Sequence, residues 1–338
     1  MDRHAWEQPG AHEEAPGIYR IPLPLPGDNL KAVNVYAVAD GEQVVMIDGG
    51  WALPDSEELL TRSLATIGYG LADIREFLVT HIHRDHYTQA IAVRRAVGSS
   101  VSLGEGERVT LEAIRTIRAH PDVASLHGAG AVELSRQLDA WTRDQGDGPD
   151  LTNWAEPDRW LPDGLELPLT TRTLRVIATP GHTRGHVVYH DPDAQVLFGG
   201  DHVLPHITPS IGIELVRPPS PLRDYLTSLA LTRAMPDARL LPAHGPATAS
   251  VHERVDELLQ HHEKRLTATA DAVAQGASTG FEVAQILTWT RHERRLDDLD
   301  LFNRIMAVNE TMAHLEVLVE RGVLRRETVD EVVHFATR

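Results

Sequence analysis

The most constraining feature of the chain is the stretch THIHRDH at residues 80–86, which places three imidazoles and one carboxylate within six residues. An apolar run at residues 74–79 precedes it and is typical of a buried strand. Because alternate residues of an extended chain point to the same side, His81 and His83 can face one ion. Imidazole and carboxylate ligands suit zinc, iron or manganese.

Asp85 and His86 lie where the chain should turn into a helix over residues 87–97, so they point to a different place from the first pair. We therefore expect two adjacent metal positions, one with His81 and His83 and the other with Asp85 and His86. The alternative is a polar loop with scattered histidines. It is disfavoured because further ligand residues recur downstream at the ends of predicted strands.

Three of these downstream residues are candidate ligands. His182 sits in a glycine-bracketed turn, where the backbone can approach an ion closely, and is the predicted third ligand of the first position. Asp201 follows a short apolar strand and two glycines, where a carboxylate can either form a turn or bridge two cations. His244 follows a strand predicted over residues 239–241 and is the third ligand expected at the second position.

Other polar residues near these positions are given supporting roles. Asp48 ends the strand predicted over residues 43–47, either as a turn former or as an acceptor that orients a metal ligand. Beside a metal site we favour the orienting role. His186 is assigned a supporting role rather than direct ligation. Tyr87 and His202 are candidates for contacting the substrate or protonating the leaving group.

Composition excludes several classes of function. The chain has no cysteine, which rules out disulfides, thiolate zinc sites and cysteine nucleophiles. Its net charge of -17 opposes non-specific binding to nucleic acid or to anionic membrane surfaces. No stretch approaches the about 18 apolar residues of a membrane span, and the N-terminus shows no signal-peptide core. We expect a cytoplasmic protein that acts on a small molecule, with no nucleic-acid or membrane partner.

Strands alternating with helices over residues 17–250 predict a layered α/β catalytic domain. Residues 1–16 are expected to form a loose N-terminal arm, and residues 105–160 a mainly helical insertion. Residues 251–338 are expected to form a long helix and a small helical domain that ends in a hairpin, like a winged helix.

The C-terminal segment is not expected to bind nucleic acid. Residues 276–338 contain eleven acidic and eight basic residues, a net charge of -3, whereas nucleic-acid domains usually show a basic face. We expect this segment to pack, to form a homodimer or to provide a pocket wall. His261 and His262, in the preceding long helix, are predicted to lie on a solvated face.

The motifs together resemble the metallo-β-lactamase superfamily over residues 17–250. They are His81-x-His83-x-Asp85-His86, Gly181-His182, Gly200-Asp201 and Ala243-His244-Gly245. The resemblance implies an αββα four-layer sandwich with two divalent metal ions at one edge, zinc in the first place and iron or manganese as alternatives. By analogy one metal is bound by His81, His83 and His182, the other by Asp85, His86 and His244, with Asp201 bridging and Asp48 supporting.

Within the superfamily the chain looks most like the glyoxalase II-like and lactamase-β-2-like hydrolases, which carry a similar C-terminal tail. The lack of cysteine argues against the true β-lactamases that use a cysteine ligand. One departure is Tyr87, since many members have small residues after the last histidine of the motif. A tyrosine there would narrow the pocket or place a hydroxyl near the substrate.

These features favour a binuclear metallohydrolase in which a metal-bridging hydroxide attacks a small ester, thioester or lactone, with acyl-thioester as the first expectation. Asp201 would hold the bridge and help to manage the proton, and Asp85 would both ligate and orient. The alternatives are a metal-dependent ribonuclease or phosphodiesterase on the same scaffold, and a non-catalytic regulator that uses the tail.

Overall fold

The structure, a computed structural model, describes residues 4–27, 30–116, 122–144, 150–290 and 292–338. The chain forms two compact units, each built from three separate segments. Unit 1 comprises Met1–Arg115, Asp150–Pro209 and Ser228–Val255, and unit 2 comprises Thr116–Pro149, Ser210–Thr227 and Asp256–Arg338.

These units differ from the predicted boundaries in two segments. Most of the insertion expected over residues 105–160 clusters with the C-terminal segment, and so does a segment after residue 209. The described part of the insertion is mainly helical, with α3 (Arg108–Thr116), α4 (Asp122–Gly128) and α5 (Val132–Asp144). Residues 117–121 and 145–149 of the insertion lie outside the described residues.

Unit 1 contains a seven-stranded sheet with the strand order β1-β2-β3-β4-β5-β6-β7. Its strands are His12–Ala15, Ile18–Pro24, Ala32–Asp40, Gln43–Ile47, Ile74–Val79, Ser100–Gly104 and Arg159–Leu161. The pairs from β1 to β4 are antiparallel, and those from β4 to β7 are parallel. Because parallel strands end at the same edge, β4, β5 and β6 carry the loops that follow them to one side of the sheet.

The strand β1 lies in the segment that was expected to be a loose arm, so that expectation is wrong for His12–Ala15. This strand pairs with Ile18–Arg20 of β2, and Gly17, at φ 72°, closes the turn between them. Pro22 and Pro24 lie beyond this pairing, where β2 is the edge of the sheet. A proline is tolerated there because it has no N–H to donate.

A second sheet faces the first. It has the order β12-β11-β10-β9-β8, from the strands Arg239–Pro242, Val196–Gly200, Val187–Asp191, Thr173–Ala178 and Glu166–Pro168. The inner faces of the two sheets share one buried cluster, in which Tyr36 and Val38 of β3 pack with Val176, Tyr189 and Phe198. The rings of Tyr36 and Phe198 meet edge to face, with centroids 5.4 Å apart.

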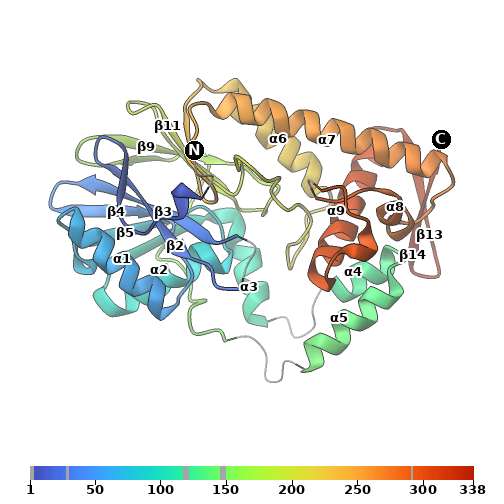
Figure 1. Ribbon diagram of the computed structural model, residues 1–338, viewed down its shortest axis with the longest axis horizontal. Helices are drawn as coiled ribbons and strands as arrows, with labels where there is room; N and C mark the ends of the chain where they lie inside the picture. Colours follow the sequence, from blue (N-terminus) through green and yellow to red (C-terminus); the bar gives the residue numbers. More distant parts are fainter. Residues whose placement is uncertain (1–3, 28–29, 117–121, 145–149, 291) are drawn as a thin grey trace. The chain divides into compact units, whose positions relative to one another are not determined.

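The helices α1 (Pro54–Thr66) and α2 (Arg84–Val97) lie on the outer face of the first sheet (Figure 1). On β3, Val33 and Val35 point to the side opposite Tyr36 and pack with Leu60 of α1 and Ile91 of α2. On the second sheet, residues 228–234 of α6 (Pro221–Ala234) pack against the loops at its edge. Ser228 Oγ of α6 donates to the Pro180 carbonyl at 2.8 Å. The predicted αββα sandwich is therefore confirmed.

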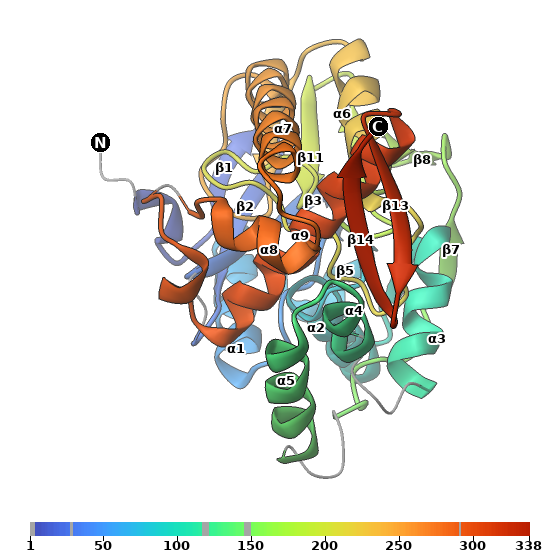
Figure 2. The same ribbon diagram turned by 90° about the vertical axis from the view of Figure 1, so that its right-hand side faces the viewer.

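Unit 2 is mainly helical and ends in a hairpin (Figure 2). The helices α8 (Gly280–Ile286) and α9 (Leu301–Glu320) precede the strands β13 (Leu324–Val329) and β14 (Val332–Thr337). This is the predicted order of elements.

Within the described residues, no helix combines the length and the apolar character needed to cross a membrane.

The long helix α7 (Val251–Ala274) buries a histidine that was predicted to be solvated. His262 has no exposed surface, and its Nδ1 lies 3.2 Å from Nε2 of His314 on α9. Burial, and then the neighbouring His314, lowers the pKa of His262 to about 2. The prediction for His262 is wrong because helix packing at this position depends on a partner 52 residues away.

Candidate metal centre

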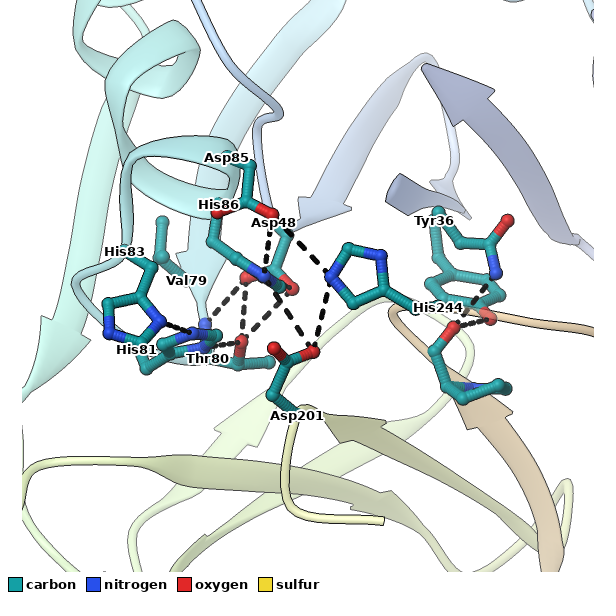
Figure 3. A network of polar contacts seen from close by, with 12 residues as sticks. Tyr36, Asp48, Val79, Thr80, His81, His83, Asp85, His86, Asp201 and His244 are labelled. Atoms are coloured by element: carbon teal, nitrogen blue, oxygen red, sulfur yellow. Dashed lines mark hydrogen bonds and ion pairs between the residues drawn. The ribbon is translucent and has the colours of Figure 1, made fainter. Parts of the chain in front are cut away.

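Five strand ends of unit 1 carry the polar residues of the predicted site. Figure 3 shows four of them, Asp48, His81, Asp201 and His244, close together. All seven predicted ligands fall into two groups, one of His81, His83, His182 and Asp201 and the other of Asp85, His86 and His244. In each group, one donor atom from every residue lies within 4.8 Å of the others. The chain segments that carry them are far apart in sequence, and only the fold places them side by side.

The first group has the spacing of ligands around a single small cation. His83 Nδ1 lies 3.0 Å from His81 Nε2 and 3.1 Å from His182 Nε2. His182 Nε2 lies 3.5 Å from Asp201 Oδ2. Ligand atoms bound tetrahedrally at zinc–nitrogen distances lie about 3.3 Å from one another. Burial, followed by the neighbouring imidazoles, lowers the pKa of His81 and brings that of His83 to about 3. The rings are therefore neutral, as metal ligation requires.

Two buried nitrogens of the second group, and one oxygen of Asp201 beside them, lack a hydrogen-bond partner. Among the described residues, His86 Nε2, His244 Nε2 and Asp201 Oδ1 make no hydrogen bond. Leaving such an atom unsatisfied costs about 1–3 kcal/mol. The Asp201 oxygen is 3.8 Å from His86 Nε2 and 3.5 Å from His244 Nε2. Asp85 Oδ2 lies 3.5 Å from His244 Nε2. A cation between these atoms would satisfy all of them, so the residues fit a second metal ion.

The electrostatic field at His86 is strongly negative. Burial alone would lower the pKa of this imidazole, but Asp48, Asp85 and Asp201 outweigh burial and raise it to about 10. Burial would likewise raise the pKa of Asp201, yet His244, His86 and His182 hold it below its usual value. A divalent cation responds to the same field as a proton. A metal ion bound by the second group would therefore take the place of a proton on His86.

Asp48 orients His86. Its Oδ1 accepts from the Thr80 N–H at 2.7 Å, and its Oδ2 lies 2.9 Å from His86 Nδ1. An ionised Asp48 can only accept, so His86 carries its proton on Nδ1 and presents the Nε2 lone pair to the site. Asp48 itself has a φ of 62°, a conformation that few residues other than glycine adopt. The predicted orienting role accounts for these contacts better than a simple turn does.

Replacing Asp48 with asparagine should weaken metal binding. With its carbonyl oxygen kept on the Thr80 N–H, the amide would turn an NH₂ group toward His86 Nδ1. The proton of His86 would then move to Nε2 and block the lone pair. We expect about 10- to 100-fold weaker binding at the second position, measured by competition with a chelator. Asp237→Asn is the matched control, since Asp237 also accepts backbone N–H groups but belongs to neither ligand group. Equal metal affinity in the two variants would contradict this role.

Strand β3 holds the loop that carries His244. The Ala32 carbonyl accepts from His244 Nδ1 at 2.9 Å. Asn34 Nδ2 donates to the carbonyls of Pro242 at 3.0 Å and Gly245 at 2.8 Å, one on each side of His244. Nothing in the local sequence around residue 34 indicates this role, because the partner loop follows about 200 residues later.

His186 lies behind Asp201 and outside both ligand groups. Its Nε2 accepts from the Asp201 backbone N–H at 3.1 Å, and its Nδ1 is 2.9 Å from Thr179 Oγ1. Its ring also stacks on that of His81, with centroids 5.0 Å apart. These contacts hold the backbone at Asp201, and the supporting role of His186 stays a prediction.

The structure does not give Tyr87 and His202 the substrate contacts that were predicted. Tyr87 is fully buried, its hydroxyl donates to the Ala155 carbonyl at 2.7 Å, and its ring stacks on Trp154. It falls on the face of α2 that packs into the core. His202 is also fully buried and lies 3.0 Å from Thr232 Oγ1. Burial lowers its pKa to about 3. This burial does not favour the predicted contact of Tyr87 and His202 with a substrate, which stays a prediction.

Comparison with known proteins adds to this geometry. Residues 28–244 match the metallo-beta-lactamase superfamily, and residues 266–338 match the metallo-beta-lactamase-like C-terminal domain. The chain is 24% identical over 312 residues to a Caenorhabditis elegans protein named beta-lactamase-like protein 2 homolog, covering 91% of this chain and 83% of that protein. It is 25% identical to an Aspergillus fumigatus protein named atrochrysone carboxyl ACP thioesterase, covering 97% of this chain and 65% of that protein. A solved metallo-beta-lactamase family protein of Thermus thermophilus superposes with a TM-score of 0.73 at 27% identity, covering 96% and 99% of the two chains.

Proposed function

The chain belongs to the metallo-beta-lactamase superfamily, and from this premise we propose that it is a binuclear metal-dependent hydrolase of small thioesters or esters. The observation that carries the proposal is the convergence of three buried atoms without hydrogen-bond partners, His86 Nε2, His244 Nε2 and Asp201 Oδ1. The neutral imidazoles of His81 and His83 lie in the neighbouring group. A purely structural polar cluster would satisfy such atoms within itself.

When bound, two divalent cations would lower the pKa of water to about 7 and polarise the scissile carbonyl. The protein's part is to hold the ligands and to handle the proton. Asp48 fixes the tautomer of His86, and His186 fixes the backbone at Asp201. The Asp85 side chain is 20% exposed, against 10% for Asp201. Of the two, Asp85 is therefore the carboxylate that can exchange a proton with the substrate side, while Asp201 lies between the two groups.

Two observations support a thioester or ester as the substrate class. One relative, matched along almost this entire chain, is named as a thioesterase that acts on an acyl carrier protein. The net charge of -17 opposes the binding of long phosphodiester chains. A small neutral or weakly charged acyl compound is not opposed by this net charge.

A substrate panel tests this proposal. Protein loaded with zinc, iron or manganese would be given an acyl thioester of N-acetylcysteamine, the oxygen ester of the same acyl group, a lactone and a labelled single-stranded RNA. We expect the thioester to be hydrolysed fastest and the RNA to remain intact. His83→Ala purified in the same way is the control, and its loss of activity excludes a contaminating esterase. Cleavage of RNA with no turnover of any acyl compound would contradict the proposed substrate class.

A further inference from the structure

Glu107 is a buried carboxyl group that belongs to neither ligand group. It ends the short turn Glu105–Glu107 that follows strand β6, and it has no exposed surface. A carboxyl group buried in this way is rare unless it has specific partners, because removing it from water is costly. Its partners therefore indicate what it does.

One oxygen of Glu107 contacts both loops that carry the first ligand group. The Ile82 N–H donates to Oε1 at 3.4 Å, and the Thr183 hydroxyl donates to the same oxygen. Ile82 stands between His81 and His83, and Thr183 directly follows His182. Ile82 and Thr183 are 101 residues apart in sequence, and a single carboxylate oxygen joins their loops.

The backbone around this contact is packed so closely that its glycines leave no room for a Cβ atom. A Cβ atom on Gly185 would lie 2.1 Å from the Glu107 nitrogen, and one on Gly106 would lie 2.8 Å from the Arg184 carbonyl oxygen. A Cβ atom on Gly104 would lie 2.2 Å from the Gly185 carbonyl oxygen. The turn after β6 and the loop after His182 thus touch backbone to backbone, and the Glu107 side chain lies across their junction.

We propose that Glu107 is a positioning residue that fixes the separation of His182 from the His81–His83 pair, so that the three rings can bind one cation together. This inference rests on the proposed metal site. The arrangement that Glu107 holds is the one in which His83 Nδ1 lies 3.0 Å and 3.1 Å from the other two ring nitrogens. The Ile82 N–H and the Thr183 hydroxyl both donate to Glu107, so these two contacts need an acceptor rather than a charge. Burial raises the pKa of Glu107 to about 7, against the hydrogen bonds from Thr183, Ile82 and Thr110 and the nearby charge of Arg184, so a neutral acceptor fits these contacts.

The experiment compares Glu107→Gln, which keeps an acceptor oxygen, with Glu107→Met, which has none. Metal-free proteins are titrated with Co²⁺, and the visible absorption bands and competition with a chelator give the affinity of each position. We expect Glu107→Met to bind one of its two cobalt ions about 10- to 100-fold more weakly and the other normally, with altered bands for the weakened position. Glu107→Gln should resemble the wild-type protein. Near-ultraviolet circular dichroism verifies that each variant is folded.

A second pair of variants decides the matter if Glu107→Met does not fold. Thr183→Val removes one of the two donors with little change of volume, and it should weaken the same cobalt position. Thr269→Val is its matched control, because Thr269 is equally buried and its hydroxyl makes no hydrogen bond among the described residues. In a folded double variant, Thr183→Val should add little to Glu107→Met, since the two residues share one contact.

Two results would overturn the positioning role. The first is wild-type cobalt affinity in Glu107→Met or in Thr183→Val. The second is a Glu107→Gln variant as impaired as Glu107→Met. A wild-type protein that binds no cobalt would overturn the proposed metal site and this inference with it, so the two failures are distinguishable.

Discussion

Removing all bound metal should lower the turnover of an acyl substrate by at least about four orders of magnitude. Without a cation, water ionises with a pKa of about 15.7 rather than about 7, and no other group in the site compensates for that loss. Asp85 and Asp201 are held as carboxylates by the surrounding histidines, so they can accept a proton but cannot polarise a carbonyl. The measurement is the turnover of chelator-treated protein, with metal content determined by mass spectrometry.

The return of activity provides the control for metal removal. Zinc, iron or manganese should restore turnover, since imidazole-rich sites suit these ions. Magnesium should not, because it prefers oxygen ligands and six-fold coordination. The metal-free protein should remain folded, because the sandwich core around residues such as Tyr36 and Phe198 is buried independently of the site. Undiminished turnover in protein shown to be free of metal would refute the mechanism.

Replacing Asp201 with alanine should have the second largest effect. Its two oxygens lie 3.5 Å from His182 Nε2 and from His244 Nε2, so one side chain serves both ligand groups. Its loss leaves each position one ligand short and removes the negative charge between the histidines. We expect kcat/KM to fall at least about a thousand-fold, equivalent to about 4 kcal/mol, and bound metal to fall below two ions per chain.

Asp193→Ala is the matched control for Asp201→Ala. Asp193 lies in the exposed turn between β10 and β11, on the same sheet, and is the same residue type. Its replacement should leave metal content and turnover unchanged. An Asp201→Ala protein that keeps two metal ions and ordinary turnover would show that Asp201 is not shared between the groups.

Much of the site could be predicted because its residues follow apolar runs. His81, His182, Asp201 and His244 each come after a strand that the hydrophobic pattern identifies. Parallel or adjacent strands then bring these ends to one edge. The chemistry of the side chains and the regularity of the sheets carry this inference together. Neither depends on contacts between distant segments, which a local sequence pattern does not reveal.

The remaining features depend on contacts between distant segments. Glu107 and Asn34 act through backbone groups of other loops, and no local pattern distinguishes them from ordinary polar residues. Tyr87 follows the motif directly, yet the rotation of α2 turns its ring into the core. The division into units was also missed, because helices of the insertion recognise the C-terminal segment through tertiary packing alone.

The interrupted construction of unit 2 bears on how the chain matures during its synthesis. Asp122 pairs with Arg217 and with Asn309, which follow it by 95 and 187 residues. A growing chain that has left the ribosome only as far as residue 255 holds all segments of unit 1 but lacks the last segment of unit 2. The helices of unit 2 that are already synthesised then lack the segment that covers their apolar faces. Such exposed faces promote aggregation and binding by chaperones. Unit 1 can therefore reach its native form before unit 2 has received its final segment.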